Sequence, residues 1–377
     1  MALTKDFGFG PDETLVRDSA RKFLKETFPI ERLRRLVAAD HHAAYESAIQ
    51  PVAHDESLWQ QIVELGWSAL AVPETAGGVG AKTIAIAALI EEVGHAALPS
   101  PLVSTVIATT VLRAAGATAA LEEIAAGTTA TLAITDADGS WRFADTPLTA
   151  TPAKGGVTLN GRVAYVQDAR KAQRFVVSAR AADGVGLYIV PADAPGITVT
   201  PDRIVDLTRD QATITFDGTP ATVGAAAGTG ERVLNDALPT ILTIVAADLC
   251  GAAEWQLQTT TEYAKLRSQF EHPIGFFQAV KHPIVNMMLA VDRARSLMYA
   301  AACAIDHEPE DALRLARMAK AAAADAAAFA SNRSVQLHGG IGFTWECDVH
   351  IYFKRQQHNE FLYGDATYQR ARLAELA

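Results

Sequence analysis

Apolar residues in roughly the first 125 positions recur at the spacing of an α-helix. In the segment LWQQIVELGW, Leu58, Ile62 and Leu65 fall on one side of a helix and the polar residues fall on the other. Asp55 precedes this run as an N-cap, and Gly66 follows it as a stop signal. The same period returns in two later runs, IAIAALIEEVGHAAL and VSTVIATTVLRAAG. The pattern therefore predicts a helical N-terminal domain.

Between about Thr129 and Gly218 the pattern changes to short segments rich in β-branched residues, which Gly, Pro, Asp and Asn separate. The segments are TLAITDA, GGVTLNGRVAYVQ, RFVVSARA, GLYIVPA, GITVTP and ATITFDG. Asn160 and Gly161 predict a hairpin turn, because both central positions of such a turn favour positive φ. So many short strands in so short a stretch predict a compact β-barrel or sandwich.

After residue 226 the helical period returns and continues to the end of the chain. A first long run is interrupted only by Pro239, and two further long runs follow it. Alanine is frequent in these runs, and small side chains let helix axes approach closely, as in a four-helix bundle. The sequence thus predicts an α+β protein with an N-terminal helical domain at 1–126, a middle β-barrel domain at 127–226 and a C-terminal four-helix bundle at 227–377.

Hydrophobic residues make up 49% of the chain and charged residues 20%, which is ordinary for a globular protein. The formal charge of −10 argues against non-specific binding to nucleic acid, which needs a dense positive surface. The N-terminal segment MALTKDFGFG lacks the apolar core of a signal peptide, and the most apolar window, at 238–251, contains an Asp and is too short for a bilayer. We therefore expect a cytoplasmic protein without nucleic-acid or membrane partners.

The three cysteines, Cys250, Cys303 and Cys347, are widely spaced and form no CxxC pair. No His lies at a spacing that would complete a metal site with them. We expect reduced, buried thiols and no bound metal.

Five segments, distributed over nearly the whole chain, carry a specific resemblance to a known family. They are ELGWSALAVPETAGGVG, EEVGHAALPSP, VTLNGRVAYV, YAKLRSQFEHPIGFFQAVKHPIVNM and QLHGGIGFTWE. In these segments, in its length and in its order of helices, strands and helices, the chain resembles the acyl-CoA dehydrogenases. Members of that family have a helical N-terminal domain, a β-domain and a C-terminal four-helix bundle, and the last two segments are the most distinctive.

The resemblance implies a binding site for FAD. In family members the Arg of an RxxF segment binds the diphosphate of an FAD that the neighbouring subunit mainly holds, and this role falls on Arg267. A planar guanidinium suits phosphate oxygens, because it makes two charge-assisted hydrogen bonds at once. Phe270 and Gln278 on the same segment would match the contacts on the adenine side.

A second stretch of the family's cofactor site, QxxGG, matches Gln336, Gly339 and Gly340. Glycines here let main-chain N–H groups approach a phosphate or a ribose, since no Cβ stands in the way. His338, inside this stretch, has no metal partner and is expected to pack against its neighbours.

The chain departs from the family at the catalytic base. Members carry a Glu just before a Gly near the C-terminus, which removes the α-proton of the acyl-CoA, and aligning on Gln369 and Arg370 places Tyr363 there. Some relatives carry the Glu early in the first long bundle helix, a position that falls near Ile241. A neutral Tyr is a poor base near pH 7, and Ile cannot accept a proton.

Two other acids are candidate catalytic bases. Asp365 lies two residues past the tyrosine, on what should be the same loop. Asp248 lies about two helical turns beyond the alternative family position, on the same helix face, and its apolar neighbours predict a buried carboxylate. Each can also be a structural acid, and we expect Glu254 and Glu262 in surface or subunit contacts.

The β-domain departs from the family as well. The stretch that usually ends in Ala-Gly-Ser-Asp and contacts flavin reads TDADGSWRF, and Tyr165 and Val166 stand where Trp-Ile is usual. In family members these elements hold the ring of the chain's own flavin. The chain therefore keeps the residues that reach a partner's FAD and lacks those that would hold its own.

This split pattern resembles one kind of subunit in the heteromeric (α2β2) acyl-CoA dehydrogenases of actinobacterial steroid side-chain degradation, where FAD lies only between unlike chains. The resemblance implies FAD-dependent α,β-dehydrogenation of a bulky steroid or branched acyl-CoA, a second subunit of this fold as partner and electron-transfer flavoprotein as acceptor. A homo-oligomer, a catalytically silent structural subunit that stabilises a partner chain, and another chemistry such as that of an oxidase stay open.

Overall fold

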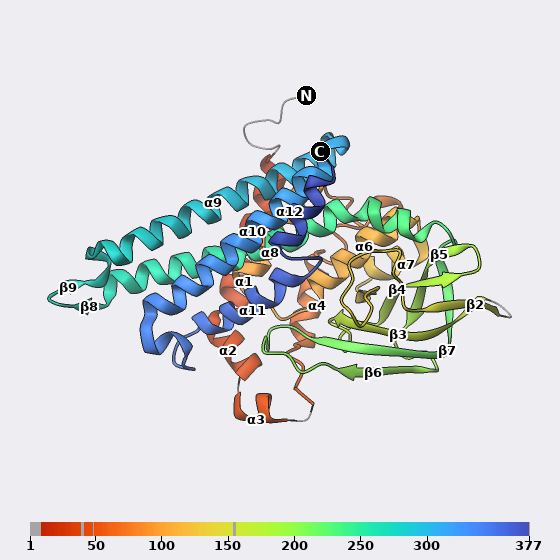
Figure 1. Cartoon of the computed structure of the whole chain (residues 1–377), viewed down its shortest axis with the longest axis horizontal. Helices are drawn as coiled ribbons and strands as arrows, with labels where there is room; N and C mark the ends of the chain where they lie inside the picture. Colours follow the sequence, from red (N-terminus) through yellow and green to blue (C-terminus); the bar gives the residue numbers. More distant parts are fainter. Residues whose placement is uncertain (1–8, 39–40, 48, 154–155, 377) are drawn as a thin grey trace. The chain divides into compact units, whose positions relative to one another are not determined.

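The computed structural model describes residues 9–38, 41–47, 49–153 and 156–376 (Figure 1). Two compact units divide the chain, and neither is continuous in sequence. The first, here the helical unit, comprises Met1–Ala39, Thr83–Leu98 and Leu242–Ala377. The second, here the β-unit, comprises Asp40–Lys82 and Pro99–Ile241.

The helical unit consists of long helices with one short hairpin. Its elements are α1 (Pro11–Thr27), α2 (Ile30–Ala38), α5 (Thr83–His95), α8 (Gly230–Leu266, from Leu242 onward), β8 (Ser268–Gln269), β9 (His272–Pro273), η2 (Ile274–Phe276), α9 (Gln278–His307), α10 (Pro309–His338), η3 (Gly339–Phe343), α11 (Val349–Phe361) and α12 (Ala366–Ala374). Alanine on the inner faces of α9 and α10 explains how these two 30-residue helices pack closely.

Helices α5 and α8 cross with their backbones in direct contact, and two glycines permit this. A Cβ on Gly94 would lie 2.2 Å from the carbonyl oxygen of Asp248, and one on Gly251 would lie 1.9 Å from that of Glu91. Asp306 at the end of α9 accepts hydrogen bonds from the first two amides of α5, at 2.9 and 3.2 Å. Such a cap satisfies donors that the helix itself cannot pair.

Among the described residues, one helix is long and apolar enough to cross a membrane, α8. Of its most apolar window, 78% is buried inside the protein, as in the core helix of a globular fold. Length and composition alone therefore do not make α8 a membrane span.

The β-unit combines a sheet with short helices. Its elements are α3 (His41–Glu46), α4 (Glu56–Glu64), η1 (Glu74–Ala76), α6 (Leu102–Ala115), α7 (Thr118–Ala125), β1 (Ala130–Ala133), β2 (Thr149–Ala153), β3 (Gly156–Gln167), β4 (Arg174–Ala181), β5 (Gly184–Pro191), β6 (Ile197–Pro201), β7 (Gln211–Ala225) and the first turns of α8. Asp55 caps α4 as predicted, because its carboxylate accepts from the amide of Leu58 at 3.1 Å.

The sheet closes on itself. Strand β4 pairs with both β2 and β5, and β3 and β7 complete the ring β4-β2-β3-β7-β5. Strand β1 also pairs with β4, and β6 also pairs with β7. Fully buried side chains such as Phe175 and Phe216 fill the interior. The predicted fold class is confirmed: helices come first, then a barrel-like sheet, then the C-terminal helices.

The hairpin turn predicted at Asn160 and Gly161 is wrong. Both residues lie inside the single strand β3, at a register shift in its pairing with β7. Gly161 has a φ of +127°, and a Cβ there would lie 2.8 Å from the carbonyl oxygen of Pro147. The Asn-Gly pair therefore marks a β-bulge under a close-packed segment and not a turn.

Candidate cofactor site

Arg267 follows the last residue of α8 and begins a tight hairpin. Its main-chain oxygen accepts from the amide of Ile274 at 2.8 Å, and β8 and β9 pair beyond it. The two turn residues, Phe270 and Glu271, both have positive φ, as a two-residue hairpin of this twist requires. The Arg267 side chain is exposed and makes no ion pair with any residue that the structure describes. The Arg267 cation is thus exposed to solvent at the start of a hydrogen-bonded hairpin.

Aromatic rings surround the base of this hairpin. Phe270 itself is 85% exposed, and its ring meets that of Phe277 edge to face at 6.2 Å. His272 stacks on Phe276 at 4.3 Å. Gln278, the first residue of α9, is exposed immediately after these rings. An exposed aromatic side chain next to amide and guanidinium donors is the composition expected for contact with a nucleotide base.

The QxxGG stretch ends α10. Gln336, Gly339 and Gly340 are all exposed, and Gly339 has a φ of +65°. A Cβ built on either glycine would meet no heavy atom within 4 Å, so the space beside this backbone is open. Gly342 differs, because a Cβ there would lie 2.7 Å from the carbonyl oxygen of Val335. Gly339 and Gly340 therefore leave room for a ligand, while Gly342 allows the backbone to pack closely against Val335.

The ends of α8 and α10 lie together, at the end of the unit where Figure 1 shows β8 and β9. The ring of Tyr263 on α8 stacks on His338 on α10 at 4.2 Å, and its hydroxyl donates to the His338 carbonyl oxygen at 3.4 Å. His338 is buried and its Nδ1 lies 2.8 Å from the Ser334 carbonyl oxygen, while burial lowers its pKa. The histidine therefore packs, and its contacts bring the two predicted cofactor segments to one face.

The residues of this face fit one part of an FAD molecule. The unpaired cation of Arg267 suits a diphosphate, the open backbone at Gly339 and Gly340 suits a phosphate or ribose, and Phe270 suits adenine. All of them face solvent, so in this chain alone the dinucleotide would have one wall.

The position of the family's base lies in the turn between α11 and α12. Tyr363 there is 9% exposed and has a φ of +57°, and burial raises the pKa of its phenol. Asp365 is half-buried and caps α12, since its carboxylate accepts from the amide of Tyr368 at 2.7 Å. One oxygen of Asp365 thus has a structural task. Ile241, the other family position, is fully buried.

Asp248 is buried, as predicted, but its carboxylate is fully engaged. Arg355 on α11 donates to both oxygens, at 3.1 and 2.7 Å, and Asn359 donates to one of them at 2.8 Å. A base needs an accessible lone pair within reach of the proton it removes. The geometry favours a structural role for Asp248 and leaves Asp365 as the better candidate base of the two.

The β-unit residues that replace the family's flavin contacts bond to their own surroundings. Tyr165 has a φ of +58°, and its hydroxyl donates to the carbonyl oxygen of Ala137 at 3.1 Å. Asp136 accepts from the amides of Asp138 and Ser140, which closes the 136–140 turn on itself. Because these groups pair with one another, they do not present a ready set of donors for a flavin ring.

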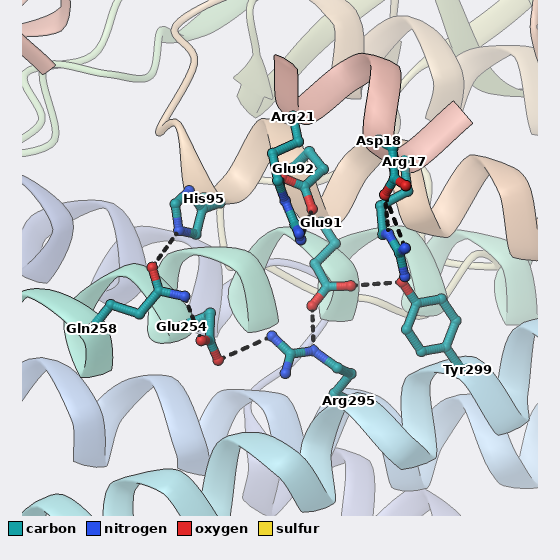
Figure 2. Close-up of polar contacts among 10 residues, drawn as sticks. All are labelled: Arg17, Asp18, Arg21, Glu91, Glu92, His95, Glu254, Gln258, Arg295 and Tyr299. Carbon is teal, nitrogen blue, oxygen red and sulfur yellow. Dashed lines mark hydrogen bonds and ion pairs between the residues drawn. The ribbon is translucent and has the colours of Figure 1, made fainter. Parts of the chain in front are cut away.

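A charged cluster that the sequence did not reveal ties four helices of the helical unit together (Figure 2). Arg295 on α9 donates to Glu91 on α5 and, at 3.0 Å, to Glu254 on α8. Arg21 on α1 holds Glu92 through two hydrogen bonds, at 3.1 and 2.7 Å. Glu254, which we expected in surface or subunit contacts, is partly buried and binds Arg295 within the same chain.

The pKa of Arg295 reflects this cluster. Burial opposes its charge, but the Glu91 and Glu254 carboxylates outweigh burial and raise the pKa of the guanidinium. The cluster borders a cavity of about 740 Å³ between α1, α2, α5, α8, α9 and α11. Four basic side chains (Arg17, Arg21, Lys25, Arg295) and four acidic ones (Glu31, Glu91, Glu92, Glu254) line the cavity. The Arg, Lys and Glu side chains of the lining therefore carry no net charge.

Comparison with sequence families gives two matches that together span most of the chain. The model described as acyl-CoA dehydrogenase, N-terminal domain, matches residues 10–131, and the one described as acyl-CoA dehydrogenase, C-terminal domain, matches residues 228–377. The chain is 30% identical to the acyl-CoA dehydrogenase IpdE2 of Mycolicibacterium smegmatis over 350 residues, which cover 91% of this chain and 97% of the relative. It is 32% identical to IpdE2 of Mycobacterium tuberculosis over 305 residues, 80% of each chain.

Solved structures with the same fold include two whose names pair two proteins. A variant of the Tcur3481–Tcur3483 steroid ACAD superimposes with a TM-score of 0.85 at 28% identity, over 98% of both chains. The ChsE4–ChsE5 complex from Mycobacterium tuberculosis superimposes with a TM-score of 0.84 at 24% identity, also over 98% of both chains. The second likeness, at this identity, is evidence for the fold alone.

Proposed function

Because the chain belongs to the acyl-CoA dehydrogenase family, whose members depend on FAD, we propose that it is one subunit of a heteromeric acyl-CoA dehydrogenase. The reaction is the removal of two hydrogens from the α and β carbons of an acyl-CoA thioester. The substrate is bulky, with a steroid or branched acyl group. The observation that carries the proposal is the one-walled cofactor face formed by Arg267, Phe270 and Gly339.

Bound FAD would accept the hydride that leaves the β carbon. The part of this chain is to hold the dinucleotide. Arg267 neutralises the diphosphate, the main-chain N–H groups near Gly339 and Gly340 approach it closely, and Phe270 covers the adenine side. These contacts lie at the exposed end of α8 and α10, where a second subunit must cover them.

Two features support a partner that differs from this chain. The β-unit groups around Tyr165 are bonded to their own loops, so a second copy would offer the same incomplete flavin wall. One solved structure with the same fold, 28% identical to this chain, carries a name that pairs two proteins in a steroid ACAD. An unlike chain with an intact β-domain would complete the site. Electron-transfer flavoprotein is the acceptor we propose, by the family resemblance.

We propose that Asp365 removes the α-proton of the acyl-CoA, if the catalytic base belongs to this chain. It lies on the turn that presents the base in the family, next to Tyr363. Desolvation near a bound substrate would make a carboxylate a stronger base, as proton abstraction next to a thioester requires.

A second function is favoured by one specific observation: neither family position for the base, Tyr363 nor Ile241, carries a group that accepts a proton. The chain would then be a catalytically silent subunit that supplies half of the FAD site and stabilises its partner. The two functions differ in one respect. In the first, the site that contains the α11–α12 turn of this chain oxidises acyl-CoA, and in the second it does not.

The test is co-expression of the chain with a second acyl-CoA dehydrogenase-like subunit from the same genome. We expect little flavin absorbance for the chain purified alone, a yellow complex with its partner, and bleaching of that complex by a bulky acyl-CoA but not by a short straight-chain one. A chain that alone retains one FAD per protomer and oxidises acyl-CoA would overturn the heteromeric proposal. A yellow complex in which Asp365→Asn leaves bleaching unchanged would favour the silent subunit.

A further inference from the structure

Lys320 is a completely buried lysine in the middle of α10, with 0% of its surface exposed. Its Nζ donates to the carbonyl oxygens of Glu360, at 2.7 Å, and Gly364, at 2.9 Å. These two carbonyls bracket the turn that joins α11 to α12. One side chain therefore ties both ends of that turn to the neighbouring helix.

Lys320 holds the turn by hydrogen bonds to main-chain carbonyls and not by an ion pair, and we call this pair of hydrogen bonds the Lys320 clamp. Within the ranges that the structure describes, Lys320 has no salt bridge, although the carboxylates of Glu360 and Asp365 are near enough to influence it. Burial lowers its pKa from 10.5 to about 7, and those two carboxylates only partly oppose the shift. A neutral amine still has two N–H groups, one for each carbonyl, so the clamp persists in both protonation states.

The turn that Lys320 holds is conformationally strained. Tyr363 and the following Gly364 have φ values of +57° and +91°, and a Cβ on Gly364 would lie 2.2 Å from Cδ1 of Tyr368. Gln369 donates to the Tyr363 carbonyl oxygen and accepts from Arg317 on α10 at 2.8 Å. A non-glycine residue keeps such a backbone only where its surroundings over-determine it. Side chains from α10 and α12 do so here.

We propose that Lys320 is the positioning residue for the α11–α12 turn and fixes where Tyr363 and Asp365 stand toward the acyl-CoA. An apolar side chain would fill the same space in an alanine-rich helix without the cost of burying an amine. What the lysine adds is two hydrogen bonds to the one turn that presents the base in this family. The catalytic consequence rests on the proposed function. The two hydrogen bonds from Lys320 that hold the turn do not depend on it.

The test compares Lys320→Met, which keeps the length and removes the donors, with Lys320→Leu as a second variant without donors in case the first does not fold. Arg314→Ala on the same helix is the control, because that side chain is exposed and forms an ion pair with Asp311, one turn away on the same helix. All are studied in the full-length complex with its partner. Hydrogen exchange is followed for the amides of Leu362 and Gly364, which donate to Asn359 and Phe361 across the turn.

We expect exchange at the turn to accelerate about tenfold or more in the Lys320 variants, with α9 and α10 unchanged, since about one net hydrogen bond is lost at each carbonyl. With an acyl-CoA substrate, kcat for flavin reduction should fall at least about tenfold while KM and flavin content change little. Unchanged exchange at the turn, or acceleration spread over the whole bundle, would overturn the clamp whatever the activity is. Accelerated exchange with an unchanged kcat would overturn the positioning role, while a wild-type complex without activity would count against the proposed function alone.

Discussion

Asp248 and Arg355 form a two-point ion pair inside the helical unit, with N···O distances of 3.1 and 2.7 Å and side-chain exposures of 1% and 0%. Asn359 adds a third hydrogen bond to the same carboxylate. Both charges are removed from water, so each depends on the other for stabilisation. The pair joins α8 to α11, the helix that leads into the turn with Tyr363.

Breaking this pair should destabilise the protein strongly. Arg355→Met leaves the Asp248 carboxylate buried without its cation, and we expect a loss of about 3–5 kcal/mol in the free energy of unfolding. Urea unfolding followed by circular dichroism measures it. The matched control is Asp236→Asn on the same α8 helix, where the exposed pair with Arg232 should contribute less than about 1 kcal/mol. Equal effects of the two substitutions would contradict a structural role for Asp248.

The same reasoning applies to the four-helix charged cluster of Figure 2. Arg295→Met leaves the largely buried Glu91 and the partly buried Glu254 without their common cation, so we expect a loss of several kcal/mol, about 3–5, in the free energy of unfolding. Asp292→Asn is the control, because Asp292 is 62% exposed and lies 3.8 Å from the same guanidinium. It should change stability by less than about 1 kcal/mol. A similar loss in both variants would show that the cluster is not a stabilising centre.

Much of the fold follows from local patterns, and particular residues show why. The stripe of Leu58 and Ile62 and the cap Asp55 are neighbours in sequence, so periodicity alone predicts α4. The sequence pattern does not predict strand β2, because Thr149–Ala153 is short and contains Pro152, which normally argues against a strand. The Asn160-Gly161 bulge depends on contact with Pro147, which no short-range rule contains.

The FAD-binding roles of Arg267 and the QxxGG stretch follow from short family motifs, and they stay predictions. The charged residues that hold the fold could not be predicted from the sequence. Glu91 and Arg295 are 204 positions apart in the sequence. Two adjacent carboxylates in an apolar helix, Glu91 and Glu92, are equally typical of a helix face exposed to solvent. Lys320 lies among alanines and resembles a surface residue until the α11–α12 turn is placed against it. Such contacts arise from tertiary packing, which depends on many residues far apart in the sequence and not on any local pattern.

Arg267 should matter for FAD retention and not for folding. Its side chain is exposed and unpaired among the described residues, so Arg267→Ala should leave thermal unfolding unchanged. Loss of a charge-assisted bond to phosphate is worth about 1.5–3 kcal/mol, or roughly ten- to a hundredfold in affinity. Flavin released on dilution of the complex, measured by fluorescence, tests this, with exposed Arg113→Ala as the control. Equal flavin affinity in both variants would mean that the diphosphate is bound elsewhere.

Stability should depend on pH through Lys320. The pKa of its amine is lowered from 10.5 to about 7 in the folded protein, so between these values the unfolded chain binds a proton that the folded one does not. The free energy of unfolding contributed by Lys320 therefore rises with pH across this window, by up to about 1.4 kcal/mol per pH unit. Urea unfolding of wild type and Lys320→Met at pH 7, 8 and 9 isolates this term as a difference. A difference that stays flat or falls with pH would be the opposite of this expectation.

The last prediction concerns Asp365, whose two possible tasks can be separated by substitution. Its carboxylate caps α12 through the amide of Tyr368, and Asn caps a helix about as well as Asp. Asp365→Asn should therefore keep the stability of the protein, while Asp365→Ala should lose about 1 kcal/mol. General-base catalysis accelerates a reaction by about 10²–10⁴-fold. If Asp365 removes the α-proton, the Asn variant should therefore reduce bound flavin at least about a hundredfold more slowly. Its flavin content should be unchanged. Stopped-flow bleaching of the assembled complex by acyl-CoA measures the rate. A wild-type rate in the Asn variant, together with a loss of stability in the Ala variant, would assign Asp365 to the helix cap alone and move the base to the partner subunit.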